Sequence, residues 1–282
     1  MLEIFEFKSI NKGKSILITG AVHGNEICGT KAIGSIINKI KSKELILKNG
    51  SITFIPITNP EAYKQNKRFY EINLNRTIKK NQNAKLYEEK IGNILTEYIE
   101  KNDYYLDLHS MHKNSQPMLF QDYEESADFV KNLGLEYVIT GWPEVYKNDT
   151  LSEDFSTQGY GHKVNTITCT AECGSHNDSH SVVVAEQLIL NALSYLDIID
   201  YKTTTNKEQK IVKLEKVIFK EYEGSFTKDY NELDVIKKGS IMASYDNGEK
   251  IIAEKDYYIL LPNKNAKIGE EWFYLCSINK IF

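Results

Sequence analysis

The feature that most constrains the fold of this chain is a regular alternation of short β-branched runs with longer helical patterns. The short runs are rich in Ile, Val, Thr and Tyr and end at glycine or polar residues, which is typical of buried strands. We expect strands at residues 16–19, 52–57, 104–108, 137–140 and 166–171. Apolar side chains recur at helical spacing in three longer segments, and we expect helices at residues 26–41, 84–100 and 181–196. This alternation predicts an α/β fold with a mainly parallel, mixed sheet flanked by helices.

The pattern changes near residues 201–206. From Gln209 onward, short β-type runs are broken by turn signals such as Lys-Lys-Gly at 237–239 and Asp-Asn-Gly at 246–248. The sequence therefore predicts two domains, an α/β domain at residues 1–205 and a smaller all-β domain at residues 206–282.

Composition narrows the class of protein. Apolar residues make up 41% and charged residues 26% of the 282 residues, as in ordinary globular proteins. The net charge of −4, without a basic stripe, argues against a nucleic-acid partner. No apolar run approaches the roughly 20 residues of a membrane span, and the acidic start of the chain differs from a secretory signal. We therefore expect a cytoplasmic protein without a membrane partner, and both a monomer and a homo-oligomer remain open.

The first chemical signal is the sequence His23-Gly24-Asn25-Glu26, which follows the first predicted strand. A spacing of three residues across the first turn of a helix brings an imidazole and a carboxylate to one point. Gly24 permits a tight backbone path, and Asn25 is a candidate cap for the helix. We interpret His23 and Glu26 as two candidate metal ligands.

Catalytic zinc usually has three protein ligands and one open position, so a third ligand is needed. His109 is the candidate, because it follows the predicted strand 104–108 in the way that His23 follows the strand 16–19. Asp107 lies on the same side of that strand and is expected to orient His109. His112, three residues further on, is the alternative ligand.

Arginine is rare in this chain, since only Arg68 and Arg76 occur among its 35 Lys and Arg residues. Arginine offers a rigid, permanently charged fork that lysine cannot copy. A hydrolase of acylated amino acids needs a cation near the scissile carbonyl and a partner for the free carboxylate. We assign the first role to Arg68 and the second to Asn75 and Arg76.

Glu172 completes the candidate site. It directly follows the predicted strand 166–171 and is close to Gly174. A carboxylate in this place could take a proton from a water molecule that the metal activates, which makes Glu172 the candidate general base.

With these residues assembled, the chain resembles the succinylglutamate desuccinylase/aspartoacylase family, which has a zinc carboxypeptidase-like fold. Four motifs match in order, namely His23-Gly24-Asn25-Glu26, Asn73-Leu74-Asn75-Arg76, Asp107-Leu108-His109 and Ala171-Glu172-Cys173-Gly174. The resemblance implies one zinc ion per chain, and the ligands that it implies are His23, Glu26 and His109.

The same resemblance implies roles for the other residues of the site. Glu172 would be the general base and acid, Arg68 would polarise the carbonyl, and Asn75 with Arg76 would hold the substrate carboxylate. In the family a tyrosine from the C-terminal domain reaches the site, and Tyr258 is the matching candidate.

Two departures from the family pattern change what we expect of the site, the first in the charge behind the metal ligands and the second in recognition of the substrate. Asn73 stands where the family often has aspartate, and no arginine follows Arg76, although aspartoacylase-like enzymes use a further arginine to recognise an acidic side chain. Lys147 and Lys163 are the candidate replacements.

We therefore predict a zinc-dependent hydrolase that cleaves an amide bond of an N-acylated amino acid or a related small molecule. Ester hydrolysis by the same site, a metallocarboxypeptidase that acts on short or cell-wall peptides, and a non-catalytic binding protein with a degenerate pocket are the alternatives.

Overall fold

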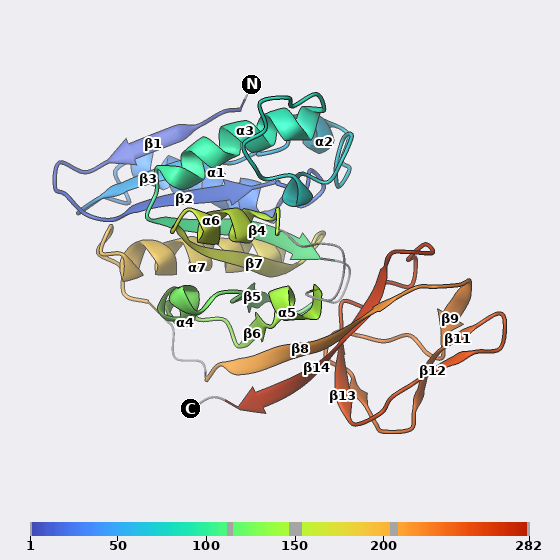
Figure 1. Ribbon diagram of the computed structural model, residues 1–282. Coiled ribbons are helices and arrows are strands. Elements are labelled where there is room, and N and C mark those ends of the chain that lie inside the picture. Colours follow the sequence, from blue (N-terminus) through green and yellow to red (C-terminus); the bar gives the residue numbers. More distant parts are fainter. Residues whose placement is uncertain (1, 112–114, 147–153, 204–207, 281–282) are drawn as a thin grey trace. The chain divides into compact units, whose positions relative to one another are not determined.

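The computed structural model describes residues 2–111, 115–146, 154–203 and 208–280 (Figure 1). The chain divides into two compact units, one made of residues 1–136 and 153–209 and the other of residues 137–152 and 210–282. Of the described residues, 137–146 thus group with the C-terminal strands, whereas the sequence pattern placed them in the N-terminal domain. The second unit includes the helix α5 (Trp142–Tyr146) besides its strands, so a separate all-β domain is not confirmed.

The first unit is built on a mixed sheet with the strand order β1-β3-β2-β4-β7-β5. The strands are β1 (Phe5–Lys8), β2 (Ser15–Gly20), β3 (Ser51–Ile55), β4 (Tyr104–Met111), β5 (Met118–Phe120) and β7 (Ile167–Ser175). Strands β3, β2, β4 and β7 are parallel, and β1 and β5 pair antiparallel with β3 and β7. Strands β2, β3 and β4 are almost entirely buried because helices cover both faces of the sheet. The predicted mixed α/β fold is confirmed.

The helices of this unit are α1 (Cys28–Lys41), α2 (Pro60–Lys64), α3 (Tyr87–Glu100), α4 (Ala127–Leu133), α6 (Thr157–Lys163) and α7 (Ser179–Tyr195), with short 3₁₀ turns at Leu74–Arg76 and Glu124–Ser126. Helices α1 and α7 pack against each other and against the central strands. The three long helices appear where the apolar periodicity predicts them. Helix α1 begins at Cys28 rather than at residue 26, and α3 begins at Tyr87 rather than at residue 84.

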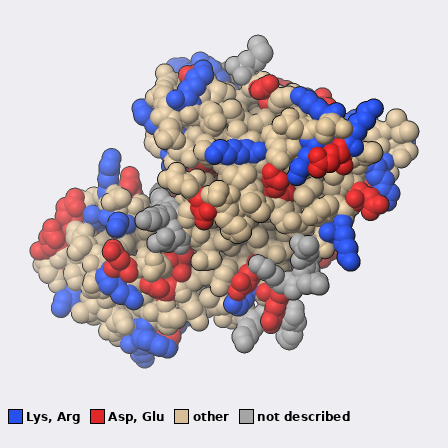
Figure 2. Space-filling view, turned by 180° about the vertical axis from the view of Figure 1, so that it is seen from behind, with Lys and Arg blue, Asp and Glu red and all other residues tan. Residues whose placement is uncertain are grey.

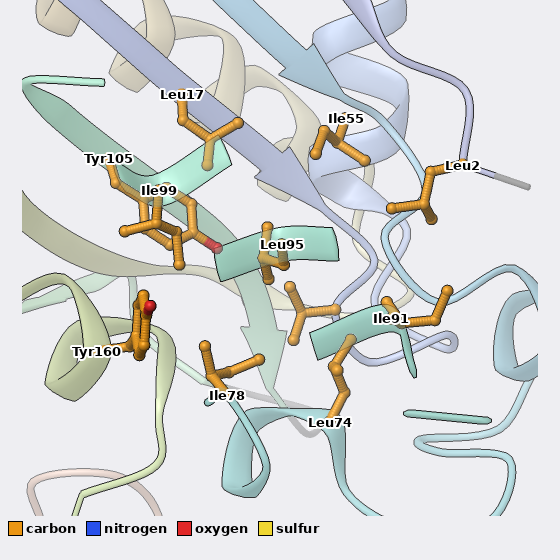
Figure 3. Close-up of a cluster of buried hydrophobic side chains, with 11 residues drawn as sticks. Leu2, Leu17, Ile55, Leu74, Ile78, Ile91, Leu95, Ile99, Tyr105 and Tyr160 are labelled. Carbon is orange, nitrogen blue, oxygen red and sulfur yellow. The ribbon is translucent and has the colours of Figure 1, made fainter. Parts of the chain in front are cut away.

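A buried apolar cluster packs α3 and α6 against the face of the sheet that α1 and α7 do not cover (Figure 3). Its members are Leu2, Leu17, Val22, Ile55, Leu74, Ile78, Ile91, Leu95, Ile99, Tyr105 and Tyr160. Burying each such side chain contributes about 1.5–3 kcal/mol, so this cluster is a main source of rigidity for the face that it covers. Side chains alternate along a strand, so Asp107 and His109 project from β4 on the same face as Tyr105, toward its carboxyl end.

In the second unit, the strands β6 (Tyr137–Thr140), β8 (Lys210–Phe219), β14 (Glu271–Lys280), β13 (Tyr257–Leu260) and β10 (Val235–Ile236) are neighbours in that order. A three-stranded sheet has the order β12-β11-β9, formed by β12 (Lys250–Ile252), β11 (Ile241–Tyr245) and β9 (Gly224–Phe226). The predicted turn at 246–248 connects β11 to β12, and Gly248 has a φ of +94°, which favours glycine. The fully buried Trp272 and Phe273 are part of the core of this unit.

The surface carries both signs of charge. On the face drawn in Figure 2, Lys and Arg side chains are interspersed with Asp and Glu. Within the described residues, no helix combines the length and the apolar character that crossing a bilayer requires.

Candidate functional site

His23 and Glu26 approach each other through a turn that precedes α1. The Glu26 N–H donates to the His23 carbonyl at 3.0 Å, which closes this turn before the helix starts at Cys28. The expectation that the first helical turn aligns the two side chains is therefore wrong, and so is the expectation that Asn25 caps the helix, because Ile27 occupies the N-cap position. The spacing of three residues still brings the two together, because a closed turn has a reach similar to that of one helical turn.

Gly24 is required in this turn for steric reasons. A Cβ atom at this position would lie 2.2 Å from the carbonyl carbon of Ala62 and from the backbone nitrogen of Tyr63. The backbone of α2 therefore packs directly against the turn, and only glycine permits this approach.

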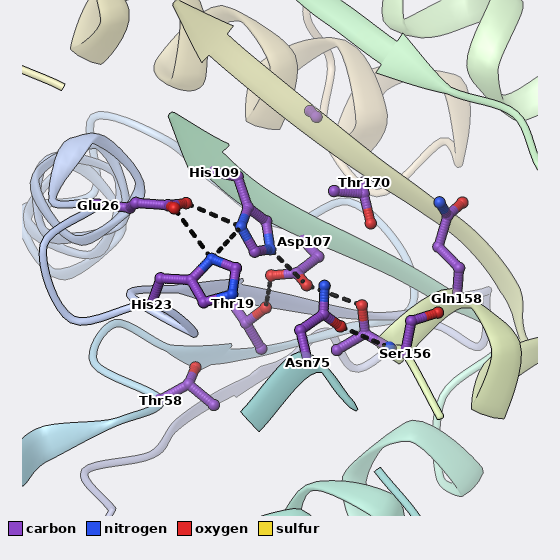
Figure 4. Close-up of polar contacts among 12 residues, drawn as sticks. Thr19, His23, Glu26, Thr58, Asn75, Asp107, His109, Ser156, Gln158 and Thr170 are labelled. Carbon is purple, nitrogen blue, oxygen red and sulfur yellow. Dashed lines mark hydrogen bonds and ion pairs between the residues drawn. The ribbon is translucent and has the colours of Figure 1, made fainter. Parts of the chain in front are cut away.

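The side chains of His23, Glu26 and His109 converge at one buried point (Figure 4). His23 Nδ1 lies 2.9 Å from Glu26 Oε1, His109 Nδ1 lies 2.8 Å from Glu26 Oε2, and the two Nδ1 atoms are 3.2 Å apart. All three side chains are at most 3% exposed. The structure therefore brings together the three residues proposed as ligands, and this group could hold a metal ion.

His109 lies within β4, which continues to Met111, so its predicted position beyond the end of the strand is wrong. The predicted orienting contact with Asp107 is present, because His109 Nε2 lies 2.9 Å from Asp107 Oδ2. This contact directs Nδ1 of the same ring toward Glu26 and His23, as a carboxylate partner commonly does for a metal-binding histidine.

Two hydroxyl groups hold Asp107, and sequence reasoning assigned them no role. Thr19 Oγ1 donates to Oδ1 at 2.7 Å, and Thr157 Oγ1 donates to Oδ2 at 2.8 Å. Thr19 is the register partner of Asp107 on β2, so a polar residue at the end of an apolar strand was an available signal. Thr157 lies 50 residues away in the chain, and no local pattern indicates this contact.

Asn73 is the corresponding partner of His23. The His23 Nε2 atom lies 3.1 Å from Asn73 Oδ1, which also accepts the backbone N–H of Asn75 at 3.0 Å. His23 is therefore oriented by a neutral amide, whereas His109 is oriented by a carboxylate.

Burial and neighbouring charges determine the protonation of the three converging side chains. Burial lowers the pKa of His23 to about 4, so its imidazole is neutral near pH 7 and can offer a lone pair. Burial opposes the ionisation of Glu26, but His23 and His109 outweigh it and hold the pKa of Glu26 well below its usual value. Burial lowers the pKa of His109, but the negative charges of Asp107 and Glu26 outweigh burial and raise this pKa well above the ordinary histidine value. Two carboxylates around one imidazole thus create a site that favours positive charge.

Glu172 lies beside this group on β7, where it is the register partner of His109 on the neighbouring parallel strand β4. It is inside β7, which continues to Ser175, so its predicted position past the strand end is wrong. Its Oε2 atom is buried and has no hydrogen-bond partner among the described residues. Burial, and then the charge of Glu26, raises the pKa of Glu172 to about 8. A carboxyl group with a pKa near neutrality can both accept and donate a proton.

Arg68 contacts the same group from the other side. Its Nη1 donates to Glu26 Oε1 at 2.9 Å, while half of its side chain is exposed. The backbone carbonyl of Arg68 accepts the Gly24 N–H at 3.2 Å, so the segment is also tied to the turn. The structure therefore places this cation next to the proposed ligands.

Asn75 and Arg76 lie in the 3₁₀ turn Leu74–Arg76 of the same segment. Asn75 Oδ1 accepts the Thr157 N–H at 2.8 Å, which fixes the orientation of the amide. Arg76 is exposed and donates to the Asn75 carbonyl at 2.9 Å.

The structure does not place the other sequence candidates beside His23, Glu26 and His109. Lys163 is the last residue of α6, and it lines a separate pocket of about 220 Å³ together with Lys79, Phe155 and His162. Lys147 and His112 lie outside the described residues. Tyr258 is half-buried on β13 of the second unit, and its role stays a prediction.

Comparisons with known proteins agree with the motifs. The model of the succinylglutamate desuccinylase/aspartoacylase catalytic domain matches residues 12–196, which is more than half of the chain. A succinylglutamate desuccinylase from Shewanella piezotolerans is 23% identical over 95% of this chain and 83% of that protein. A probable aspartoacylase from Prochlorococcus marinus is 35% identical, but over only 36% of this chain and 35% of its own length.

Solved structures show the same fold. A succinylglutamate desuccinylase from Silicibacter sp. TM1040 superposes with a TM-score of 0.78 at 18% identity, covering 99% of this chain and 89% of that one. The product-bound ectoine utilization protein EutE (DoeB) from Ruegeria pomeroyi has a TM-score of 0.77 at 18% identity, with 97% and 88% covered. From its match to the family model, this chain belongs to the succinylglutamate desuccinylase/aspartoacylase family, a family of deacylases.

Proposed function

We propose that this protein is a zinc-dependent hydrolase that cleaves the amide bond of an N-acylated amino acid or a related small molecule. The observation that carries the proposal is the buried, unpartnered carboxyl oxygen of Glu172 beside the group formed by His23, Glu26 and His109. A proton-transfer group and a cation-binding group in one place are the two parts that metal-assisted hydrolysis requires.

The chemistry of the donor set supports zinc. Two imidazoles and one carboxylate are a common ligand set of catalytic zinc, and bonds of about 2.0–2.1 Å place neighbouring donors of a tetrahedral site about 3.3 Å apart. The Nδ1 atoms of His23 and His109 are 3.2 Å apart, close to this value, and each lies 2.8–2.9 Å from a different oxygen of Glu26. A zinc ion held by these residues would supply Lewis-acid polarisation of a carbonyl and would lower the pKa of water.

Glu172 is proposed to move the proton. Its Oε2 atom takes a proton from the attacking water as the water oxygen bonds to the carbonyl carbon. It then donates this proton to the leaving nitrogen as the carbon–nitrogen bond breaks, so the products are a carboxylic acid and an amine. The second proton of the water then passes from the acid to the amine, which leaves a carboxylate and an ammonium group near neutral pH. A pKa of about 8 supports both directions of transfer near neutral pH.

Arg68, Asn75 and Arg76 are proposed to bind the substrate. Arg68 donates one N–H to Glu26. Its side chain is half-exposed, and the other N–H groups of the guanidinium can donate to the oxygen of the scissile carbonyl. Arg76 is the fork for a substrate carboxylate. The bond from the Thr157 N–H holds Asn75 Oδ1, so the NH₂ end of the same amide is the donor that would meet that carboxylate.

The side chain of the substrate is left open. The matched relatives include succinylglutamate desuccinylases and a probable aspartoacylase, whose names specify acidic substrates. This chain has no arginine after Arg76 to pair with a second carboxylate, so we propose the N-acyl amino acid class without an acidic side chain as a requirement.

The proposal is tested with Glu172→Gln, which keeps the shape of the side chain but cannot accept a proton. We expect zinc content to stay near one ion per chain while kcat falls by about 10²–10⁴-fold or more. The substrates are a panel of N-acyl amino acids, the corresponding esters and short peptides, and Glu97→Gln, an exposed change on α3, is the control. Full turnover by the Glu172→Gln protein, or a wild-type protein that binds no zinc, would overturn the proposal.

A further inference from the structure

Glu88 is a buried acidic residue that has no place in the proposed chemistry. It lies in the first turn of α3 (Figure 1), and its side chain is fully buried. Its Oε1 atom accepts the Tyr70 N–H at 2.6 Å, and its Oε2 atom accepts the N–H groups of Glu71 at 3.1 Å and Ile72 at 3.3 Å. Three successive backbone N–H groups thus converge on one carboxylate, an arrangement that stabilises an anion through aligned peptide dipoles.

The same carboxylate reaches a second element. Asn59 Nδ2 donates to Glu88 Oε1 at 3.1 Å, while Asn59 Oδ1 accepts the Ala62 N–H at 3.3 Å and so caps α2. The backbone of Ala62 in turn lies against Gly24 of the ligand turn. Glu88 therefore joins two segments that both border the candidate metal site.

The three residues that Glu88 holds lie between two residues that contact the proposed ligands. Arg68, two positions before Tyr70, bonds to Glu26, and Asn73, directly after Ile72, lies 3.1 Å from His23 Nε2. The segment 69–72 contains no helix or strand of its own, so its path depends on contacts with other segments. The bonds to Glu88 are contacts of this kind.

We propose that Glu88 is a positioning residue that holds the segment Tyr70–Ile72 and thereby keeps the Arg68 guanidinium at Glu26. The effect on catalysis rests on the role given to Arg68 under the proposed function. The effect on the backbone does not, because it follows from the hydrogen bonds alone.

The first test is Glu88→Gln, in which an NH₂ donor replaces one of the two acceptor oxygens and faces the converging N–H groups. Glu89→Gln is the matched control, since Glu89 is the next residue, is only partly buried, and accepts the N–H groups of Lys85 and Leu86 at the start of the same helix. We expect amide hydrogen exchange of Tyr70–Ile72 to speed up by about tenfold or more in Glu88→Gln and to be unchanged in Glu89→Gln. Unchanged exchange in Glu88→Gln, or an equal increase along all of α3, would refute the positioning role.

The second test is a double-mutant cycle with Arg68→Ala in the zinc-loaded protein. If Glu88 acts through Arg68, Glu88→Gln lowers kcat by about tenfold in the wild-type background and by less than about threefold in the Arg68→Ala background. Zinc content measured in all four proteins should stay at one ion per chain, because no ligand is changed. Equal losses in both backgrounds would contradict the inference. A wild-type protein that cleaves none of the substrates would defeat the proposed function instead, and the exchange of Tyr70–Ile72 would still decide the role of Glu88.

Discussion

Asp107 offers the sharpest test of how the candidate metal site is held. One of its oxygens accepts the Thr19 hydroxyl at 2.7 Å, and the other accepts the Thr157 hydroxyl at 2.8 Å and lies 2.9 Å from His109 Nε2. Loss of such a partner behind a metal-binding histidine typically lowers metal affinity by about 10–100-fold, or about 1.4–2.7 kcal/mol.

The contacts of Asp107 decide where in this range two substitutions fall. In Asp107→Asn, the remaining oxygen can still face His109 and Thr157. The new NH₂ group can then face Thr19, whose hydroxyl can turn because it also contacts the Tyr105 hydroxyl at 2.9 Å. The orientation of His109 is kept and only the charge is lost, so we expect a decrease of about tenfold in zinc affinity. Asp107→Ala removes the orienting atom and the acceptor of both the Thr19 and the Thr157 hydroxyls, so we expect a decrease of about 100-fold.

The assay is competition for zinc against a chromogenic chelator at fixed pH, with circular dichroism to verify folding. Asp128→Asn is the control, since Asp128 is an exposed residue of α4. The reasoning fails if folded Asp107→Ala binds zinc as tightly as Asp128→Asn, or if Asp107→Asn is weaker than Asp107→Ala.

Two further predictions concern stability. Burial raises the pKa of Glu232 to about 7 from 4.5, so the folded state favours the protonated form and stability is lost as pH rises through about 7. In urea unfolding, Glu232→Gln should therefore exceed the wild type by about 1–3 kcal/mol at pH 9 and match it near pH 4, and an equal difference at both pH values would contradict this cause. Gly24→Ala would place a Cβ 2.2 Å from the backbone of Ala62 and should lower the unfolding free energy by about 3 kcal/mol or more, together with zinc content. Gly34→Ala, which meets no atom within 4 Å, should instead be neutral or stabilising by up to about 1 kcal/mol, and equal melting temperatures of the two variants would refute the steric argument.

The elements of the fold follow largely from local pattern. The run at 16–19 lies in β2, and the apolar periodicity of 181–196 corresponds to α7, because burial on both faces or on one helical face imposes these patterns. Element ends were less predictable. Strands β4 and β7 continue past His109 and Glu172, because ladder hydrogen bonds with neighbouring strands extend them beyond the apolar run.

The grouping of the chain into units also depended on long-range contacts. The strand at 137–140 is adjacent in sequence to the first unit, yet it pairs parallel with β8 and groups with the C-terminal strands. A local pattern identifies a strand, but it does not specify the partner of that strand.

By itself, the sequence determined the candidate chemistry of this protein. A histidine and a glutamate three apart, a histidine at the end of an apolar strand and two rare arginines were sufficient to select His23, Glu26, His109 and Arg68, because few residue types can bind zinc or grip a carbonyl oxygen.

Only the tertiary structure decided how that chemistry is held. Thr157 supports Asp107 from 50 residues away, and Glu88 holds the backbone of Tyr70–Ile72 from a different helix. Such contacts join segments that are far apart in the chain. In the sequence, nothing distinguishes these Thr and Glu residues from other Thr and Glu residues. Their function is created by folding, which brings one donor to one acceptor, and no local periodicity encodes that pairing.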